Sequence, residues 1–260
     1  MFPRLSSNEF DFQVASLSWT ALRERSQKVV TSLLSQRKMI LIIDLDRCFM
    51  ALKSPDTLTV SESKEYFELT ESNMFMKIRP GFDDFLRCVQ SDFLVYILSQ
   101  NENLMEVIDK GNEVGWKVCQ SPTNAYYFLF NESLIMFRIT LDPKRAFSSN
   151  GTQSLKDLKD VFLAAHFDPY RWLCLILDTD TSLWNSLYRS QILKISSFDP
   201  KQHPDFSEFR RLLTSVQQLN QDFFRTLQKN SIAGLDMCSC IEDAGAAVAQ
   251  SLALINSGCK

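Results

Sequence analysis

Two short apolar segments that each end in an aspartate constrain the fold most strongly. Residues Met39–Asp44 read MILIID, and residues Trp172–Asp178 read WLCLILD. Continuous apolar runs of this length are typical of strands in the middle of a parallel sheet, because helices cover both faces of such a sheet. We therefore predict two buried strands, each with a carboxylate at its carboxyl end.

Further strand-like segments alternate with helical patterns along the chain. Phe93–Leu98 and Gln191–Ile195 are predicted as strands, residues 53–78 as a hairpin, and 117–147 as short strands. Helical spacing is found in residues 14–36, 81–89, 101–115, 155–165, 206–228 and 244–255. This alternation predicts an α/β fold, with a parallel sheet flanked by helices on both faces, a small β insert and extra terminal helices.

Composition restricts the partners and the compartment. The net charge of -3 gives no overall basic field, so we expect no direct nucleic-acid partner. No apolar run reaches about 18 residues, so we expect no membrane span. The seven cysteines are scattered and odd in number, which favours a reducing intracellular compartment over a disulfide framework. Acids near the N-terminus (Glu9, Asp11, Glu24) favour the nucleus or cytoplasm over the mitochondrion.

The strand ends carry the candidate chemistry. Ligands of open α/β sheets bind at the carboxyl ends of the strands, so Asp44, Asp46, Ser99 and Asp178 should converge on one edge. Three carboxylates close together repel one another, and a hard cation such as Mg²⁺ relieves that repulsion. The sequence therefore predicts an oxygen-lined magnesium site.

Five segments between Met39 and Phe224 resemble, in order and spacing, the motifs of one phosphatase family. They are IIDLDRC (42–48), KIRPGF (77–82), YILS (96–99), SLKDL (154–158) and LILDT (175–179), and Trp184 follows where many members carry a bulky residue. They are similar to the motifs of the haloacid dehalogenase superfamily, in the branch of the RNA polymerase II C-terminal-domain (CTD) phosphatases. This branch includes the small CTD phosphatases and the TFIIF-associating CTD phosphatases. The resemblance implies a haloacid dehalogenase-like, Rossmann-like fold.

The resemblance also implies a role for each polar residue. Asp44 would be the nucleophile that becomes an aspartyl-phosphate, and Asp46 the general acid and base. Ser99 and Lys156 would bind phosphate oxygens. The metal ligands would be Asp44, Asp178 and the backbone carbonyl of Asp46. A phosphoprotein or phosphopeptide, with the RNA polymerase II CTD as the model, would be the substrate.

The motifs depart from the family pattern at several positions. Thr179 replaces the second acid or amide of the fourth motif, and Asp180 follows one position later. Cys48 stands where Thr or Val is usual, and we expect it to be a small buried apolar side chain. Arg47 and residues 100–102 also differ from the usual residues. These departures indicate a divergent member.

Three functions therefore stay open. The first is a magnesium-dependent protein serine/threonine phosphatase. The second is a catalytically degenerate scaffold or binding subunit of a larger complex, for which a mitochondrial translocase receptor of the same branch is the precedent. The third, a small-molecule phosphatase, is disfavoured by the RPG and KDL segments.

The chain is predicted to have three parts. Residues 1–37 would be a helical extension, 38–229 the CTD phosphatase-like domain, and 230–260 a helical tail. The terminal helices are the expected place for a protein partner to bind.

Overall fold

The computed structural model describes residues 19–60, 62–99, 104–113, 134–138, 171–201 and 206–258. The helices are α2 (Trp19–Ser35), α3 (Phe82–Val89), α4 (Leu104–Glu113), α7 (Phe206–Ile232) and α8 (Met237–Asn256). The strands are β1 (Met39–Asp44), β2 (Met50–Lys53), β3 (Phe67–Leu69), β4 (Met74–Ile78), β5 (Phe93–Ser99), β6 (Leu134–Arg138), β7 (Cys174–Asp178) and β8 (Ile192–Lys194).

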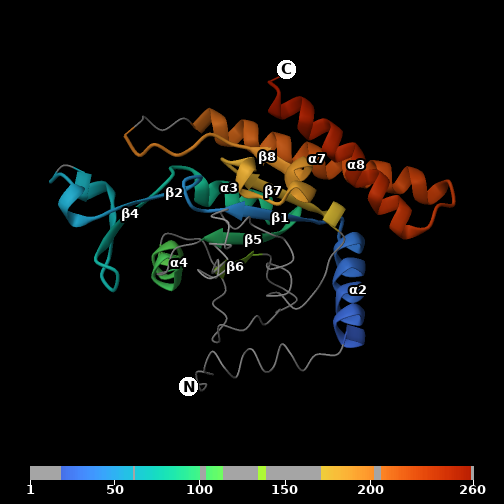
Figure 1. The fold of residues 1–260 in the computed structure, drawn as a ribbon, viewed down its shortest axis with the longest axis horizontal. Coiled ribbons are helices and arrows are strands. Elements are labelled where there is room, and N and C mark those ends of the chain that lie inside the picture. The colour runs from blue at the N-terminus through green and yellow to red at the C-terminus, as the bar shows by residue number, and fades with distance from the viewer. Residues whose placement is uncertain are drawn as a thin grey trace, which may run out of the picture.

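The main sheet has five parallel strands in the order β6-β5-β1-β7-β8 (Figure 1). Every residue of β1, β5 and β7 is buried, as their uninterrupted apolar sequences predict. Ile42 of β1 is in register with Tyr96 of β5 on one side and with Ile176 of β7 on the other. The predicted α/β fold with a parallel sheet is confirmed, and its two aspartate-terminated strands are neighbours.

A cluster of phenylalanines packs α3 and α7 together above the turn that follows β1. The ring of Phe49 stacks on Phe82 with 4.4 Å between centroids, and on Phe209 of α7 with 5.8 Å. Phe85 lies 5.8 Å from Phe209. Because such pairs add to the free energy of burial, they hold the first loop of the sheet against two helices.

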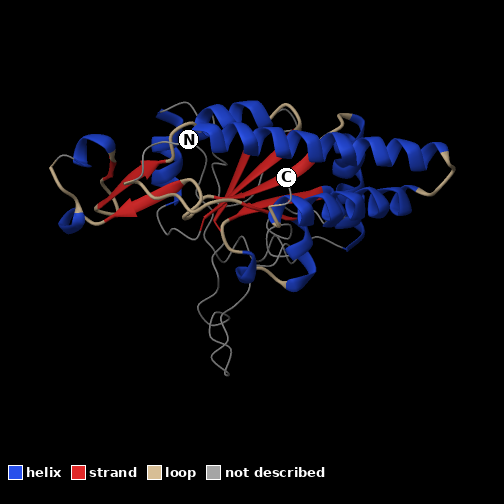
Figure 2. Ribbon diagram, turned by 90° about the horizontal axis from the view of Figure 1, so that it is seen from above, coloured by secondary structure: helices blue, strands red, loops and turns tan. Residues whose placement is uncertain are grey.

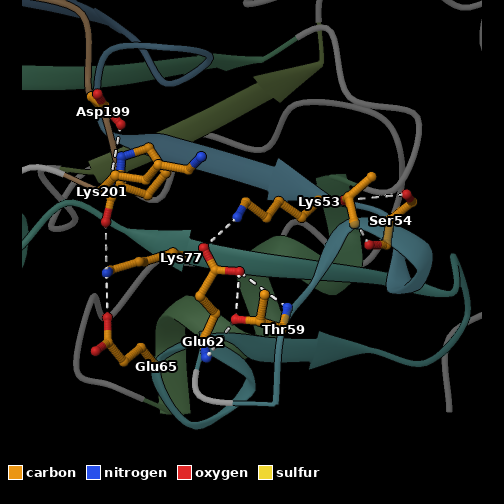
Figure 3. A network of polar contacts seen from close by, with 10 residues as sticks. Lys53, Ser54, Thr59, Glu62, Glu65, Lys77, Asp199 and Lys201 are labelled. Atoms are coloured by element: carbon orange, nitrogen blue, oxygen red, sulfur yellow. Dashed lines mark hydrogen bonds and ion pairs between the residues drawn. The ribbon is translucent and has the colours of Figure 1, made fainter.

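A small antiparallel sheet projects from one end of the main sheet (Figure 2). Its strand order is β2-β4-β3, so the predicted hairpin of residues 53–78 is a β3–β4 hairpin joined by β2. Lys53 donates a 2.7 Å hydrogen bond to Glu62 within this insert. Lys77 bridges Glu65 at 2.5 Å and the carbonyl of Pro200 at 3.0 Å, so the insert is tied to the segment that follows β8 (Figure 3).

Helices α7 and α8 form an antiparallel pair at the C-terminal end (Figure 1). The apolar face of α8 belongs to the same core as the sheet, with Cys240, Ile241, Ala244, Val248 and Leu252 buried. Asn256 accepts from the backbone N–H of Lys194 at 3.0 Å and donates to the carbonyl of Ile192 at 2.7 Å, which covers the edge of β8. The boundary predicted after residue 229 falls in the last turn of α7, and the three-part division stays a prediction.

Within the described ranges, α8 is the one helix long and apolar enough to cross a membrane. A third of its most apolar window (33%) is buried inside the protein. Since core helices of soluble proteins meet the same criterion, this is weak evidence for a membrane segment.

Candidate metal and phosphate site

Asp44 and Asp178 meet at the carboxyl ends of adjacent parallel strands. Ile43 and Leu177, the residues before them, are paired in register. The two aspartates are only 4% and 1% exposed. The expected convergence of these acids on one sheet edge is therefore present in the structure, and their proposed roles stay predictions.

Cys48 joins the two aspartates in one group. The sulfur of Cys48 and a carboxylate oxygen from each aspartate all lie within 4.8 Å of one another. The chain turns back toward the strands between Asp44 and Cys48, with Arg47 at a φ of 62° and the N–H of Leu45 donating to Leu98 at 2.8 Å. The tertiary structure thus makes Cys48 a potential metal ligand, whereas the sequence suggested only a small buried side chain.

Two N–H groups orient the carboxylate of Asp178. The indole Nε1 of Trp184 donates to Oδ2 at 2.6 Å, and the backbone N–H of Asp180 donates to Oδ1 at 3.0 Å. Carboxylates that ligate metals are commonly held in this way by outer hydrogen bonds. The sequence identified Trp184 only as a bulky residue after the fourth motif and did not predict its contact with Asp178.

Asp46 lies on the β5 side of the site. The hydroxyl of Ser99, at the end of β5, donates to Oδ1 of Asp46 at 2.7 Å. Ser99 is buried and Asp46 is half-buried. The structure therefore brings Asp46 and Ser99 together.

Arg79 of the RPG segment anchors the loop that carries Cys48. Its guanidinium donates to the carbonyl of Cys48 at 3.1 Å and to the carbonyl of Ser196 at 3.0 Å, and it pairs with Glu208 of α7. Arg79 and Glu208 have side chains only 12% and 14% exposed. The sequence contained the RPG signal but not the identity of these partners, which come from distant segments.

The structure describes two further residues at which the motifs depart from the family pattern, Thr179 and Asp180. Oδ1 of Asp180 accepts from the N–H and the hydroxyl of Ser182, at 2.8 and 2.6 Å, so Asp180 caps the next turn. Thr179 is half-buried beside Asp178. Lys156, its SLKDL segment, the predicted helix at 155–165 and residues 100–102 lie outside the described residues.

This arrangement defines the class of the fold. A parallel sheet whose central strands end in buried aspartates, with a small β insert after the first strand, is a haloacid dehalogenase-like fold. The group formed by Asp44, Cys48 and Asp178 can hold a metal ion.

Comparison with known proteins is consistent with this class. No protein-family model and no curated protein matches the sequence. One similar solved structure is a variant of the fission yeast RNA polymerase II CTD phosphatase Fcp1 bound to beryllium fluoride. It has a TM-score of 0.51 and 12% identity, and the alignment covers 80% of this chain and 70% of that one.

A second similar structure is that of Fcp1, described as an essential RNA polymerase II CTD phosphatase. Its TM-score is 0.52 with 13% identity, and the alignment covers 80% of this chain and 69% of that one. At such low identity the similarity establishes the fold alone. The chain has the fold of the CTD phosphatase Fcp1 in a divergent form.

Proposed function

We propose that this protein is a magnesium-dependent protein serine/threonine phosphatase that acts through an aspartyl-phosphate on Asp44. The observation that supports this proposal best is the buried pair of Asp44 and Asp178 at adjacent strand ends. Two carboxylates removed from water and held close together need a cation to offset their charge, and oxygen ligands suit Mg²⁺.

Magnesium would be held by Asp44 and Asp178, together with the backbone carbonyl of Asp46. When bound, it would supply charge neutralisation for the phosphoryl group. The chain's own residues supply the remaining chemistry, because phosphoryl transfer needs chiefly positioning and electrostatic stabilisation.

The reaction would proceed in two steps. A carboxylate oxygen of Asp44 attacks phosphorus, the bond from phosphorus to the serine or threonine oxygen breaks, and Asp46 gives the leaving oxygen a proton. Asp46 then removes a proton from water, which attacks the aspartyl-phosphate, releases inorganic phosphate and restores Asp44. The hydroxyl of Ser99, which donates to Asp46 in this structure, would turn to a phosphate oxygen when the substrate binds and so release the carboxyl of Asp46 for proton transfer. Ser99 and Lys156 would bind the phosphate oxygens.

Substitution of Asp44 tests this proposal. Asp44→Asn should lower the turnover of an aryl phosphate and of a phosphoserine peptide by at least about a thousandfold, because a carboxamide is a poor nucleophile. The exposed Asp56 provides a matched control, and Asp56→Asn should hydrolyse both substrates at the wild-type rate. Turnover that survives Asp44→Asn, or that survives removal of divalent ions by a chelator, would end the proposal.

One observation favours a second candidate function, a scaffold or binding subunit that does not hydrolyse phosphate. Thr179 brings no carboxylate to the metal edge, and Asp180 is engaged with Ser182 instead. The tip of the α7–α8 hairpin exposes apolar side chains at Ile232 and Met237, a surface suited to a protein partner. This candidate predicts that wild type and Asp44→Asn release phosphate at the same background rate.

A further inference from the structure

Cys48 gives the candidate metal site a ligand that the oxygen-only prediction did not include. Its side chain is fully buried, and its sulfur lies within 4.8 Å of carboxylate oxygens of both Asp44 and Asp178. The three residues come from one strand end, the loop after it and the neighbouring strand end. The fold thus brings Asp178, which is far away in sequence, close to Asp44 and Cys48.

The chemistry of this set differs from that of a magnesium site. Mg²⁺ is a hard ion that takes oxygen ligands, whereas a thiolate is a soft donor. Zn²⁺ accepts both kinds, with ideal lengths of about 2.3 Å to cysteine sulfur and about 2.0–2.2 Å to carboxylate oxygen. Three protein ligands and one open position are the usual arrangement of zinc sites that react with small molecules.

Neighbouring contacts keep these ligands in place. Trp184 and the backbone of Asp180 fix the carboxylate of Asp178, and Arg79 holds the carbonyl of Cys48. Hydrogen bonds of this kind reduce the reorganisation that a metal would otherwise require of its ligands. These contacts belong to the protein itself and support two of the three ligands.

We propose that Asp44, Cys48 and Asp178 form a thiol–carboxylate centre that binds Zn²⁺ in preference to Mg²⁺. Binding forms a zinc–sulfur bond and releases the thiol proton of Cys48 to solvent. The inference goes beyond the proposed function, since zinc binding does not require hydrolysis. One consequence does rest on the proposed function: zinc displaces Mg²⁺ from Asp44 and Asp178 and so inhibits the phosphatase.

Cobalt substitution tests the centre without an activity assay. Co²⁺ bound to a thiolate shows an intense near-ultraviolet charge-transfer band, which carboxylate ligands do not produce. Wild-type protein titrated with Co²⁺ should develop this band to one equivalent, and added Zn²⁺ should abolish it. Cys48→Thr, with an oxygen donor in place of sulfur, should lack the band. It should bind Zn²⁺ at least about a hundredfold more weakly by calorimetry, because loss of a direct ligand costs at least as much as loss of an outer hydrogen-bond partner.

Two controls separate this centre from the exposed thiols of the described residues and from misfolding. The exposed thiols of Cys88 and Cys238 could bind cobalt adventitiously, so the double variant Cys88→Ser/Cys238→Ser should keep the full band. Cys48→Ser serves if the threonine variant unfolds, as judged by circular dichroism. A wild-type protein without the band, or a folded Cys48 variant that retains it, would overturn the inference.

The two proposals fail separately. A cobalt band without Mg²⁺-dependent hydrolysis would leave the zinc centre standing and remove the phosphatase. Hydrolysis that depends on Asp44, in a protein without the cobalt band, would support the phosphatase and overturn the zinc centre.

Discussion

The indole nitrogen of Trp184 donates a 2.6 Å hydrogen bond to Oδ2 of Asp178, and both side chains are buried. Hydrogen bonds to charged groups are worth about 1.5–3 kcal/mol, and those that orient a metal ligand change metal affinity about 10–100-fold. We therefore treat Trp184 as the residue that positions the candidate metal ligand of β7.

Trp184→Phe should weaken divalent-ion binding by about 10–100-fold, because the phenyl ring stays aromatic and apolar but lacks the N–H donor. Calorimetric titration with Mg²⁺ and Zn²⁺ measures this directly. Trp172→Phe is the control, since Trp172 packs against α8 and its removal should change stability without changing metal affinity. Equal metal affinity in Trp184→Phe and wild type would contradict the positioning role.

Arg79→Ala should destabilise the protein by about 1.5–3 kcal/mol, because the partly buried carboxylate of Glu208 loses its cation and keeps only the hydrogen bonds from Ser196. It also removes the donor to the Cys48 carbonyl. Urea unfolding gives the free energy. Arg87→Ala is the matched control, because the Arg87–Asp84 pair is more than 70% exposed on both sides and such pairs are worth about 0–1 kcal/mol. Similar losses in the two variants would show that the Arg79 network does not hold the loop.

The insert should lose stability in acid. The hydrogen bond from Lys53, with those from Thr59, lowers the pKa of Glu62 to about 2 from its ordinary value of 4.5. Because the folded-state pKa is the lower one, the contribution is fully present above about pH 4.5 and disappears as the pH falls toward about 2.

Glu62→Gln should therefore make the stability of the protein depend less on pH between pH 5 and pH 2, because the variant lacks the carboxylate whose pKa is lowered. The midpoint of urea unfolding measures this stability at each pH. Glu68→Gln, which changes an exposed acid on β3, should follow the wild-type curve. Parallel wild-type and Glu62→Gln curves throughout that range would refute the prediction.

Gly245→Ala should destabilise the protein by about 1–3 kcal/mol through overpacking. A Cβ at this buried position of α8 would lie 2.4 Å from the Cβ of Trp172 and 2.9 Å from its Cγ. Since the buried face of α8 shares the core of the sheet, the whole thermal transition should move to lower temperature. A separate transition that alone responds to the substitution would instead support an independent tail at 230–260.

The sequence predicted those features that depend on a few consecutive residues. The unbroken apolar runs of β1, β5 and β7 predicted their burial, because such strands are covered on both faces. The aspartates that end two of those runs predicted the edge on which the site lies. The connections between these strands have a weaker hydrophobic pattern. The three-stranded insert was therefore predicted only as a hairpin.

The sequence alone therefore determined the class of fold and the meeting of Asp44 with Asp178, because both follow from strand periodicity and parallel topology. Only the tertiary structure decided which other groups surround those acids. The turn at Arg47 directs Cys48 toward them, a short helix brings the indole of Trp184 to Asp178, and α7 carries Glu208 to Arg79. Such contacts depend on the packing of segments far apart in the chain, and no local pattern of residues encodes them.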